Sequence, residues 1–407
     1  MLLDRVISFA KRLEDPKHPL LGPNLKGLYL FGLWQTGSRY RKIAYNIVHV
    51  TTIFFVISQI TELYFLRHDL NKALSNSSLT TLSVICCMKC FSFVLLQPTW
   101  CKLVKGISAE ELREITIQNS RSLKIMEGYT KYSRIITYLY WMLVGSTNTI
   151  LVVAPFLNYF LTSSYSDDTD ANVDPYPQIM SSWFPFNTEK NPGYIVATLI
   201  QIVMSVQGAA VIAIFDTCAV AIMSFLKGQM ILLKQKCMLI FENENEDYEQ
   251  FLKNIKECHR HHNFLIEQYE IFDSLLSPIM FLYVLGCSMT ICCSVVQLSL
   301  DETTYTQKLW VIQYTIGLVF QLFMYCWHGN DVFLESNDID QGVYASYWWR
   351  ATVQMRRQLI LLAGKLNKPV YLNAGPFTCL SVPTFVSVIK GSYSFFTLFS
   401  QMQEEND

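Results

Sequence analysis

The sequence predicts an all-α membrane protein with seven transmembrane helices, a cytoplasmic N-terminus, an extracellular C-terminus and helical extensions on the cytoplasmic side. Two observations lead to this fold class. The chain has 407 residues, of which 51% are hydrophobic, and it contains seven apolar stretches. Each stretch reaches the roughly 20 residues that a helix needs to cross the hydrocarbon layer. Lys and Arg are also unevenly divided among the segments that join the stretches. The stretches lie near residues 43–66, 77–98, 135–157, 193–226, 271–298, 309–328 and 376–400.

The apolar stretches favour helices over the alternatives. Strands of a membrane barrel would show a regular two-residue alternation of apolar and polar side chains, which this chain lacks. Helices of a soluble protein would need a polar face, yet 309–326 has no charged residue at all. Near-neutral net charge, −1, also offers no basic surface for nucleic acid.

The positive charges orient the helices. Of the 32 Lys and Arg residues, the segments 1–42, 99–134, 227–270 and 329–375 hold 8, 7, 6 and 5, and the alternate loops hold four. By the positive-inside rule, the four rich segments face the cytoplasm. With seven spans, the N-terminus is then inside and the C-terminus outside. A G-protein-coupled receptor has the opposite orientation.

The predicted cytoplasmic segments differ in character. Residues 1–42 contain Pro16, Pro19 and Pro23, which break any long helix. Between the spans, 102–134, 227–270 and 343–366 place apolar residues at helical spacing among charges. We therefore expect helical extensions on this side, and no linker or internal repeat divides the chain into further domains.

The longest outward segment is predicted to be irregular. Residues 158–192 carry Asp167, Asp168, Asp170 and Asp174 together with four prolines, and could fold over the bundle. None of the 12 cysteines lies in an outward segment, so no disulfide is expected in that oxidising space. One sequon, Asn76-Ser77-Ser78, lies in the first outward loop, where a glycan could be added. Because the first 26 residues have no apolar signal region, the first span is expected to direct insertion.

Two features of the sequence, a histidine run and three charged residues within spans, are candidates for chemical sites. A metal-dependent membrane enzyme needs several histidine clusters that converge on one site. Here the run 258–262 (Cys-His-Arg-His-His) contains three of the seven histidines, and the other four are isolated. A solvated helix explains that run better, and we expect no enzyme, metal or cofactor. Lys89, Asp216 and Lys390 are charged residues within spans, where charge is costly and often functional. Snorkelling, or a structural ion pair of Asp216 with a cytoplasmic-side lysine, is the alternative.

The outer half of the bundle offers a lining for a small, largely apolar ligand. The candidates combine apolar and aromatic side chains with a few hydroxyls and amides, which is typical of ligand pockets, although the same residues also suit helix packing. Assigned by helix phase, they are Ser83, Val84, Cys87, Met88, Thr147, Asn148, Leu151, Tyr194, Thr198, Ile202, Trp310, Gln313 and Tyr314.

The last third of the chain resembles insect odorant receptors. The resembling run begins at 325–332 (Tyr-Cys-Trp-His-Gly-Asn-Asp-Val) and continues through 335–336, 344–348, 356–362, 368–369, 374–377 and 381–390. It closes with 392–398 (Ser-Tyr-Ser-Phe-Phe-Thr-Leu). Gln201, Phe215-Asp216 and His262 give softer support earlier in the chain, and the topology derived above is the one that this family has.

The resemblance implies a ligand-gated, non-selective cation channel in the plasma membrane of olfactory neurons. Such a subunit works in a heterotetramer with the odorant-receptor co-receptor, and the last helices form one pore. The odorant then sits among spans two, three, four and six. Aligning the chain ends places the gate at Leu398 and Met402, with Gln401 at the narrow segment and Lys390 further along the pore helix. Lys390, Ser400 and the short 227–270 segment differ from the co-receptor and indicate a ligand-tuned subunit.

Three other functions remain open at this point. Gustatory receptors share the architecture, but their last helix typically ends in a Thr-Tyr…Gln-Phe pattern, where this chain has 392–396 (Ser-Tyr-Ser-Phe-Phe). A seven-span receptor that signals without its own pore would have the N-terminus outside. A secondary transporter would show paired broken helices in an inverted repeat, and none is found.

Overall fold

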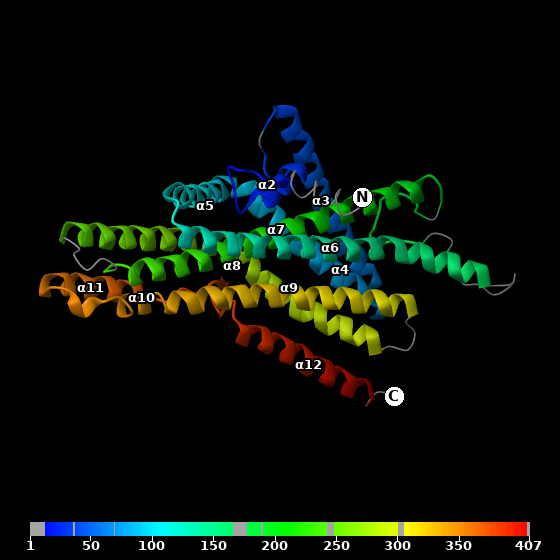
Figure 1. Ribbon diagram of the computed structural model, residues 1–407. Helices are drawn as coiled ribbons and strands as arrows, with labels where there is room; N and C mark the ends of the chain where they lie inside the picture. The colour runs from blue at the N-terminus through cyan, green and yellow to red at the C-terminus, as the bar shows by residue number, and fades with distance from the viewer. Residues whose placement is uncertain are drawn as a thin grey trace.

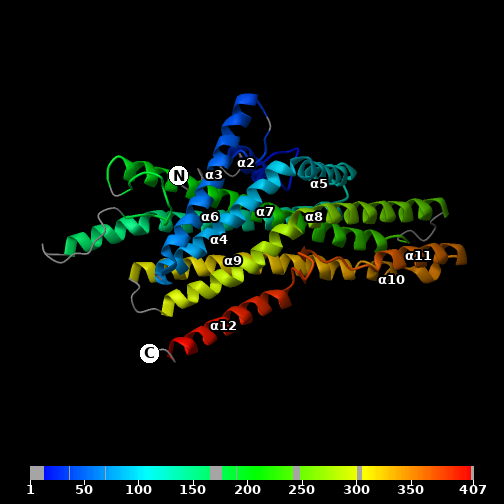
Figure 2. The same ribbon diagram turned by 180° about the vertical axis from the view of Figure 1, so that it is seen from behind.

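The computed structural model is an all-helical bundle (Figures 1 and 2) and describes residues 13–35, 37–68, 70–165, 177–188, 190–241, 248–299 and 305–404. Six helices in these ranges are long and apolar enough to cross a membrane. Four of them contain a predicted span completely, and α3 and α4 contain the first two predicted spans except for their last residues. Their bounds are α3 Arg39–Phe65, α4 Leu70–Leu95, α6 Ser120–Tyr165, α7 Gly193–Met238, α8 Tyr248–Ser299 and α9 Tyr305–Asn337.

Helix α7 is the centre of the bundle. Within its most apolar window, 89% of the residues are buried, and it packs against α4, α6, α8 and α9. A helix that is apolar all round is expected at such a position, because it has no face to present to water. The run from Val211 to Leu226 is buried almost without interruption. This helix therefore contributes to the core along most of its length.

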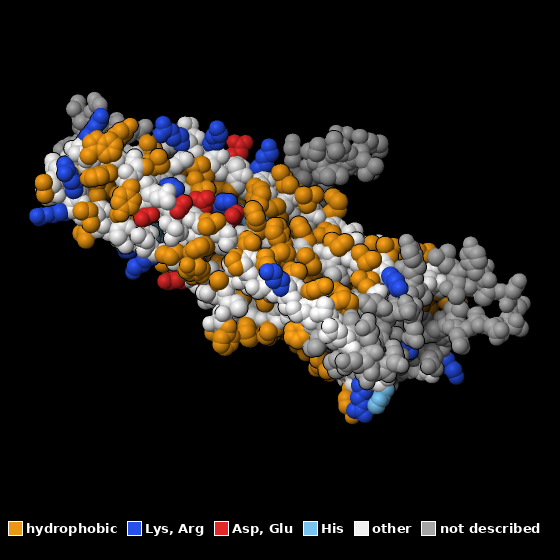
Figure 3. Space-filling view, turned by 90° about the horizontal axis from the view of Figure 1, so that it is seen from below, with side chains coloured by type: hydrophobic (Ala, Val, Ile, Leu, Met, Phe, Trp, Pro, Cys, Tyr) orange, Lys and Arg blue, Asp and Glu red, His pale blue; other side chains and the backbone are white. Residues whose placement is uncertain are grey.

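The predicted helical extensions are present and gather at one end of the bundle. They comprise α5 (Gln97–Ile117), the last turns of α7, the first turns of α8, α10 (Gln341–Tyr344) and α11 (Val353–Leu366). Pro98 in the first turn of α5 ends the second span three residues earlier than predicted, because proline favours a helix start and breaks a helix interior. Figure 3 shows Lys and Arg gathered mainly at this end, with hydrophobic side chains across the middle of the same face.

The segment before the first span packs into the bundle, which the proline content alone did not predict. Helix α2 (Gly22–Leu30) contacts α7, and Leu20, Leu25 and Leu28 are buried. Arg134 of α6 donates to the carbonyl oxygens of Pro19 and Leu20, each at 2.5 Å. The buried leucines and these charged hydrogen bonds hold the segment in place.

The final predicted span begins later than expected. A two-stranded hairpin, β1 (Asn373–Ala374) with β2 (Thr378–Cys379), occupies its predicted start, and α12 runs Val382–Glu404. The turn depends on Gly375, whose φ of +73° is left-handed, and whose N–H donates to Ser277 O. Asp273 accepts hydrogen bonds from both the backbone and the side chain of Asn373. Helix α12 then lies along the edge of the bundle against α8 and α9 (Figures 1 and 2).

Candidate functional site: an apolar cavity

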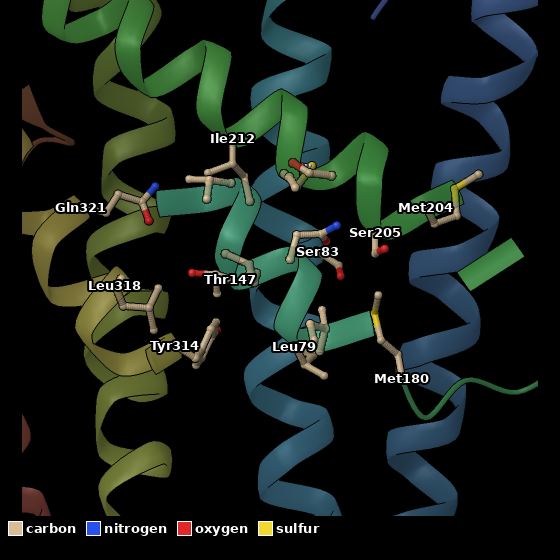
Figure 4. A pocket seen from close by; sticks show the side chains of 18 of the residues that line it. Leu79, Ser83, Thr147, Met180, Met204, Ser205, Ile212, Tyr314, Leu318 and Gln321 are labelled. Carbon is tan, nitrogen blue, oxygen red and sulfur yellow. Dashed lines mark hydrogen bonds between the residues drawn. The ribbon is translucent and has the colours of Figure 1, made fainter. Parts of the chain in front are cut away.

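A cavity of about 140 Å³ lies inside the bundle, bounded by five helices and one connecting segment (Figure 4). An apolar cavity of about 150 Å³ is large enough to bind benzene. The walls of the cavity in this structure are mainly aliphatic, aromatic and thioether groups. They are Thr52, Phe55 and Val56 of α3; Leu79, Leu82, Ser83 and Cys86 of α4; Tyr140, Leu143, Val144, Thr147, Asn148 and Leu151 of α6; Met204, Ser205, Gly208, Ala209 and Ile212 of α7; Trp310, Tyr314, Gly317, Leu318 and Gln321 of α9; and Met180.

Most hydroxyl groups of the lining are already used. Thr52, Thr147 and Ser205 each donate to a carbonyl oxygen of their own helix, three or four residues earlier. Tyr314 donates to Ser78 O and stacks on Trp310 with ring centroids 5.4 Å apart. These groups present their carbon atoms to the cavity, so that most of the surface is apolar although many of its residues are polar.

The 177–188 segment covers the end of the cavity at Met180. Gln201 of α7 holds it: its Oε1 accepts from Ile179 N–H, and its Nε2 donates to Met180 O and Ser182 Oγ. Trp183 N–H donates to Ser58 O of α3, and Tyr194 OH donates to Pro177 O. A second hollow of about 460 Å³ lies beyond and shares Met180 and Trp310 with the cavity. Residues 177–188 therefore fold over the bundle, as the sequence suggested, whereas 158–165 are not irregular as predicted but continue helix α6.

Six of the predicted ligand-binding residues line this cavity. They are Ser83, Thr147, Asn148, Leu151, Trp310 and Tyr314. Gln313 lies beside it and donates to Thr147 Oγ1 at 3.4 Å. These residues thus lie on the faces of their helices that line the cavity.

The other six predicted residues lie elsewhere. Val84 and Met88 of α4 are exposed, and Cys87 is half-buried on the same side, because the lining face of α4 is offset by about one position, or 100° of rotation. Tyr194, Thr198 and Ile202 of α7 are too close to its N-terminus, where the 177–188 segment packs. The lining of α7 instead follows Met204, Ser205, Gly208, Ala209 and Ile212, a helical spacing that the sequence does contain.

The charged residues within spans two and four form one buried cluster. Lys89 of α4 and Asp216 of α7 are fully buried, with Lys89 Nζ 2.5 Å from Asp216 Oδ1. Tyr325 donates to the same oxygen at 2.6 Å, while Tyr140 and Gln321 donate to Oδ2 at 2.7 and 2.5 Å. The partner of Asp216 is thus a lysine of the second span rather than one at the cytoplasmic side. Tyr140 and Gln321 also line the cavity, so that the cluster forms its deep end.

The pore predictions fall on α12. Phe385, Val388, Ile389 and Ser392 face the bundle, and Ser392 donates to Ser288 O of α8. Lys390 and Gln401 are exposed. The side chains of Leu398 and Met402 lie outside the described residues.

The sequon and the histidine run have structural partners. Asn76 belongs to α4 and is buried; its Nδ2 donates to Ser181 O, and its Oδ1 accepts from Thr80. The folded arrangement therefore argues against a glycan on that nitrogen.

The histidines of the 258–262 run have different neighbours. His261 Nε2 contacts Gln229 Oε1, whereas His259 Nε2 contacts Lys365 Nζ. These rings point to separate neighbours.

An acidic side chain ties the N-terminal segment to α5. Glu111 is buried; its carboxylate accepts from Leu20 N–H and from Tyr129 OH. Burial raises the pKa of the Glu111 carboxyl to about 7, and the two hydrogen bonds and the charge of Arg134 oppose the rise. This group titrates near neutral pH.

Comparison with known proteins decides the family. A sequence profile described as 7tm odorant receptor matches residues 69–393, which is most of the chain. The chain belongs to the odorant receptor family. The match confirms the resemblance seen in the last third of the sequence, and the family is one of ion channels rather than enzymes.

Individual odorant receptors are similar along nearly the whole length. Odorant receptor Or2 of Anopheles gambiae is 20% identical over 390 residues, covering 94% of this chain and 98% of the relative. Odorant receptor 82a of Drosophila melanogaster is 21% identical over 367 residues, covering 88% and 93%. The olfactory receptor OR5 of Machilis hrabei in complex with eugenol has a TM-score of 0.79 at 14% identity and covers 95% of this chain and all of that one. The odorant receptor fold is therefore shared along the full bundle.

Proposed function

We propose that this odorant receptor is the odorant-binding subunit of a ligand-gated, non-selective cation channel that works with the odorant-receptor co-receptor in the plasma membrane. The observation that carries the proposal is the mainly apolar cavity among α3, α4, α6, α7 and α9. A volatile odorant is small and largely apolar, and such a site binds it by burying its surface. The relative OR5, with the same fold, has been solved with eugenol.

The proposed topology has α12 as the seventh span. At 23 residues, α12 is about 35 Å long, which is sufficient to cross the hydrocarbon layer. The end of the bundle that carries α5, α11 and the start of α8 is rich in Lys and Arg (Figure 3), and we assign it to the cytoplasm. The chain then begins inside and ends outside. Epitope tags at each end of the receptor on intact cells would test this directly.

The proposed pore uses the free face of α12. Val386, Ser387, Lys390 and Tyr393 are exposed, since only the opposite face packs on α8 and α9. In a tetramer, four such faces could surround one path, and Leu398, Gln401 and Met402 would form its narrow end as in the family. A ligand that binds the open state more tightly would shift the population toward it.

The proposed subunit contacts lie at the cytoplasmic end. Helix α11 buries Leu359 and Leu362 within the subunit, yet Val353, Ile360 and Leu361 are 67–75% exposed. Aromatic side chains of 347–349 are exposed beside them. An exposed apolar group of this kind is typical of a protein–protein interface, and we assign it to contacts with neighbouring subunits.

Patch-clamp recording tests the function. Cells that express this receptor with the co-receptor should give a cation current to members of a broad volatile panel. Ser205→Leu, which fills the cavity, should weaken the response strongly. Ser274→Leu is the matched control, because Ser205 and Ser274 are both helical serines bonded to the carbonyl three residues earlier, but Ser274 is exposed on α8 and away from the cavity. Signalling without any current through the receptor complex would instead indicate a receptor that lacks its own pore.

A further inference from the structure

The deep end of the cavity carries hydrogen-bonding groups whose orientation is set by a buried charge. Asp216 Oδ1 lies 2.5 Å from Lys89 Nζ, and a carboxylate in such an ion pair only accepts hydrogen bonds. Gln321 lies within hydrogen-bonding distance of Asp216 Oδ2, so that its amide must turn its NH₂ group toward the carboxylate. This settles the orientation of the amide, because the reverse placement would set two acceptors against each other.

The same constraint fixes what Gln321 offers to the cavity. With one N–H of Nε2 donated to Asp216 Oδ2, Oε1 points away from that carboxylate, and in the part of the chain that the structure describes Oε1 accepts no hydrogen bond. Tyr140 is held in the same way: its hydroxyl hydrogen goes to Asp216 Oδ2 at 2.7 Å, which leaves only its oxygen lone pairs. Both residues line the cavity (Gln321 is labelled in Figure 4). Gln321 Oε1 and Tyr140 Oη are therefore the acceptors at the deep end, and the second N–H of the Gln321 amide is the only donor that these two side chains keep.

The ion pair strengthens these acceptors and excludes charged ligands. A group that donates to a carboxylate becomes a better acceptor at its other end, because hydrogen bonds in a chain polarise one another. The charge of Asp216 is matched by Lys89, which also lies 5.4 Å from the ring centroids of Phe215 and Tyr283. A ligand cation would find no net negative charge there, and it would lose its hydration.

Other polar groups of the lining do not discriminate in this way. Ser83 has a hydroxyl that can donate or accept, and the amide of Asn148 can turn by 180°. Trp310 is the contrasting case, because its Nε1–H is a buried donor without a partner among the described residues. It lies where the cavity meets the outer hollow.

We propose that the deep end of the cavity selects neutral ligands that carry a hydroxyl or N–H donor, which Gln321 Oε1 and Tyr140 Oη accept. Such a ligand is a small alcohol or phenol with its hydrocarbon part among the aliphatic and thioether side chains. The inference rests on the proposed function in one respect: the cavity must be the site where the odorant binds.

Binding to the purified full-length receptor tests this inference apart from channel opening. The probes are matched in size: benzyl alcohol, benzaldehyde and ethylbenzene, and 1-hexanol, hexanal and heptane. Ligand-induced rises in melting temperature give apparent affinities. One hydrogen bond is worth roughly three- to tenfold in affinity, and we expect the alcohols to exceed both partners by that factor.

Substitutions then locate the preference. Gln321→Met, similar in size, should abolish the advantage of the alcohols while the affinity for ethylbenzene and heptane is kept, and Tyr140→Phe should reduce it. Gln207→Met is the matched control: Gln207 is a helical glutamine that donates to Phe31 O and does not line the cavity, and its substitution should leave the preference unchanged. A variant that is simply less stable would bind all the probes less well. It would not remove the difference between the alcohols and their matched probes, so the two effects can be told apart.

Three outcomes would overturn the inference. They are equal affinity across each triplet, an alcohol preference that survives in Gln321→Met, and a preference for aldehydes that is lost in Trp310→Phe. Failure of the proposed function looks different, since alcohols would then bind preferentially while no probe evokes a current.

Discussion

Lys89 and Asp216 form an ion pair inside the bundle, with Lys89 Nζ 2.5 Å from Asp216 Oδ1 and neither side chain exposed. Asp216 accepts from four donors, which belong to α4, α6 and α9. The pair therefore joins three helices to α7 at one point. Such a pair need not add net stability, because both ions lose their hydration on burial, but it penalises the loss of either partner.

Removing one partner of the Lys89–Asp216 pair should cost more than removing both charges. Lys89→Met and Asp216→Asn each leave a buried group without its counter-charge, and each should destabilise the receptor by about 3–5 kcal/mol. The double variant should be less damaging than the sum of the two losses. Thermal unfolding of detergent-solubilised receptor, followed by size-exclusion chromatography, measures this, and simple additivity would contradict the coupling.

The turn at Gly375 should not tolerate a side chain. Gly375→Ala forces a non-glycine residue into φ +73° and places its Cβ 2.6 Å from Phe281 Cδ2, so that a loss of about 1–3 kcal/mol is expected. Gly364→Ala in α11 is the control, because a Cβ there meets no atom within 4 Å and an exposed helix position favours alanine by about 0.5–1 kcal/mol. Melting temperatures should fall for the first variant and not for the second.

Receptor stability should depend on pH through Glu111. Its pKa is about 7 in the folded state against an ordinary 4.5, so that the folded state binds more protons between these values. The contribution of Glu111 to stability is therefore largest at low pH, declines as the pH rises from about 4.5 to 7, and is constant above that range. Glu111→Gln retains an acceptor but cannot titrate. The difference in melting temperature between this variant and the unmodified receptor should change across pH 5–8, and a constant difference would refute the assignment.

The cover of the cavity should loosen when Gln201 loses its amide. Gln201→Leu removes three hydrogen bonds to residues 179–182, and the amide hydrogens of 177–188 should exchange faster with solvent. Gln207→Leu is a suitable comparison on the same helix, because Gln207 makes one long bond of 3.4 Å to Phe31 O. Hydrogen exchange read by mass spectrometry checks this, and equal exchange in the two variants would show that the segment is held by other contacts.

Much of the fold followed from local properties of the chain. Hydropathy over about 20 residues reports the free energy of transfer into lipid, which depends on composition rather than on neighbours, and the first six predicted spans lie in long helices. The spacing of residues in the last third indicated the odorant receptor family, which the full-length comparison confirms. Apolar periodicity likewise predicted helices in 102–134, 227–270 and 343–366.

The tertiary structure decided what local properties could not express. The lining of the cavity depends on how each helix is rotated about its axis, and a shift of one position moved three α4 predictions to another face. The pairing of Lys89 with Asp216 joins residues 127 positions apart, and Glu111 meets Leu20 across 91. Such contacts depend on helix packing, which follows from the combined shape of all the side chains. Composition thus determined that this chain has helices apolar enough to cross a membrane, and the residues of its last third indicated the odorant receptor family; only the packing decided which side chains line the cavity.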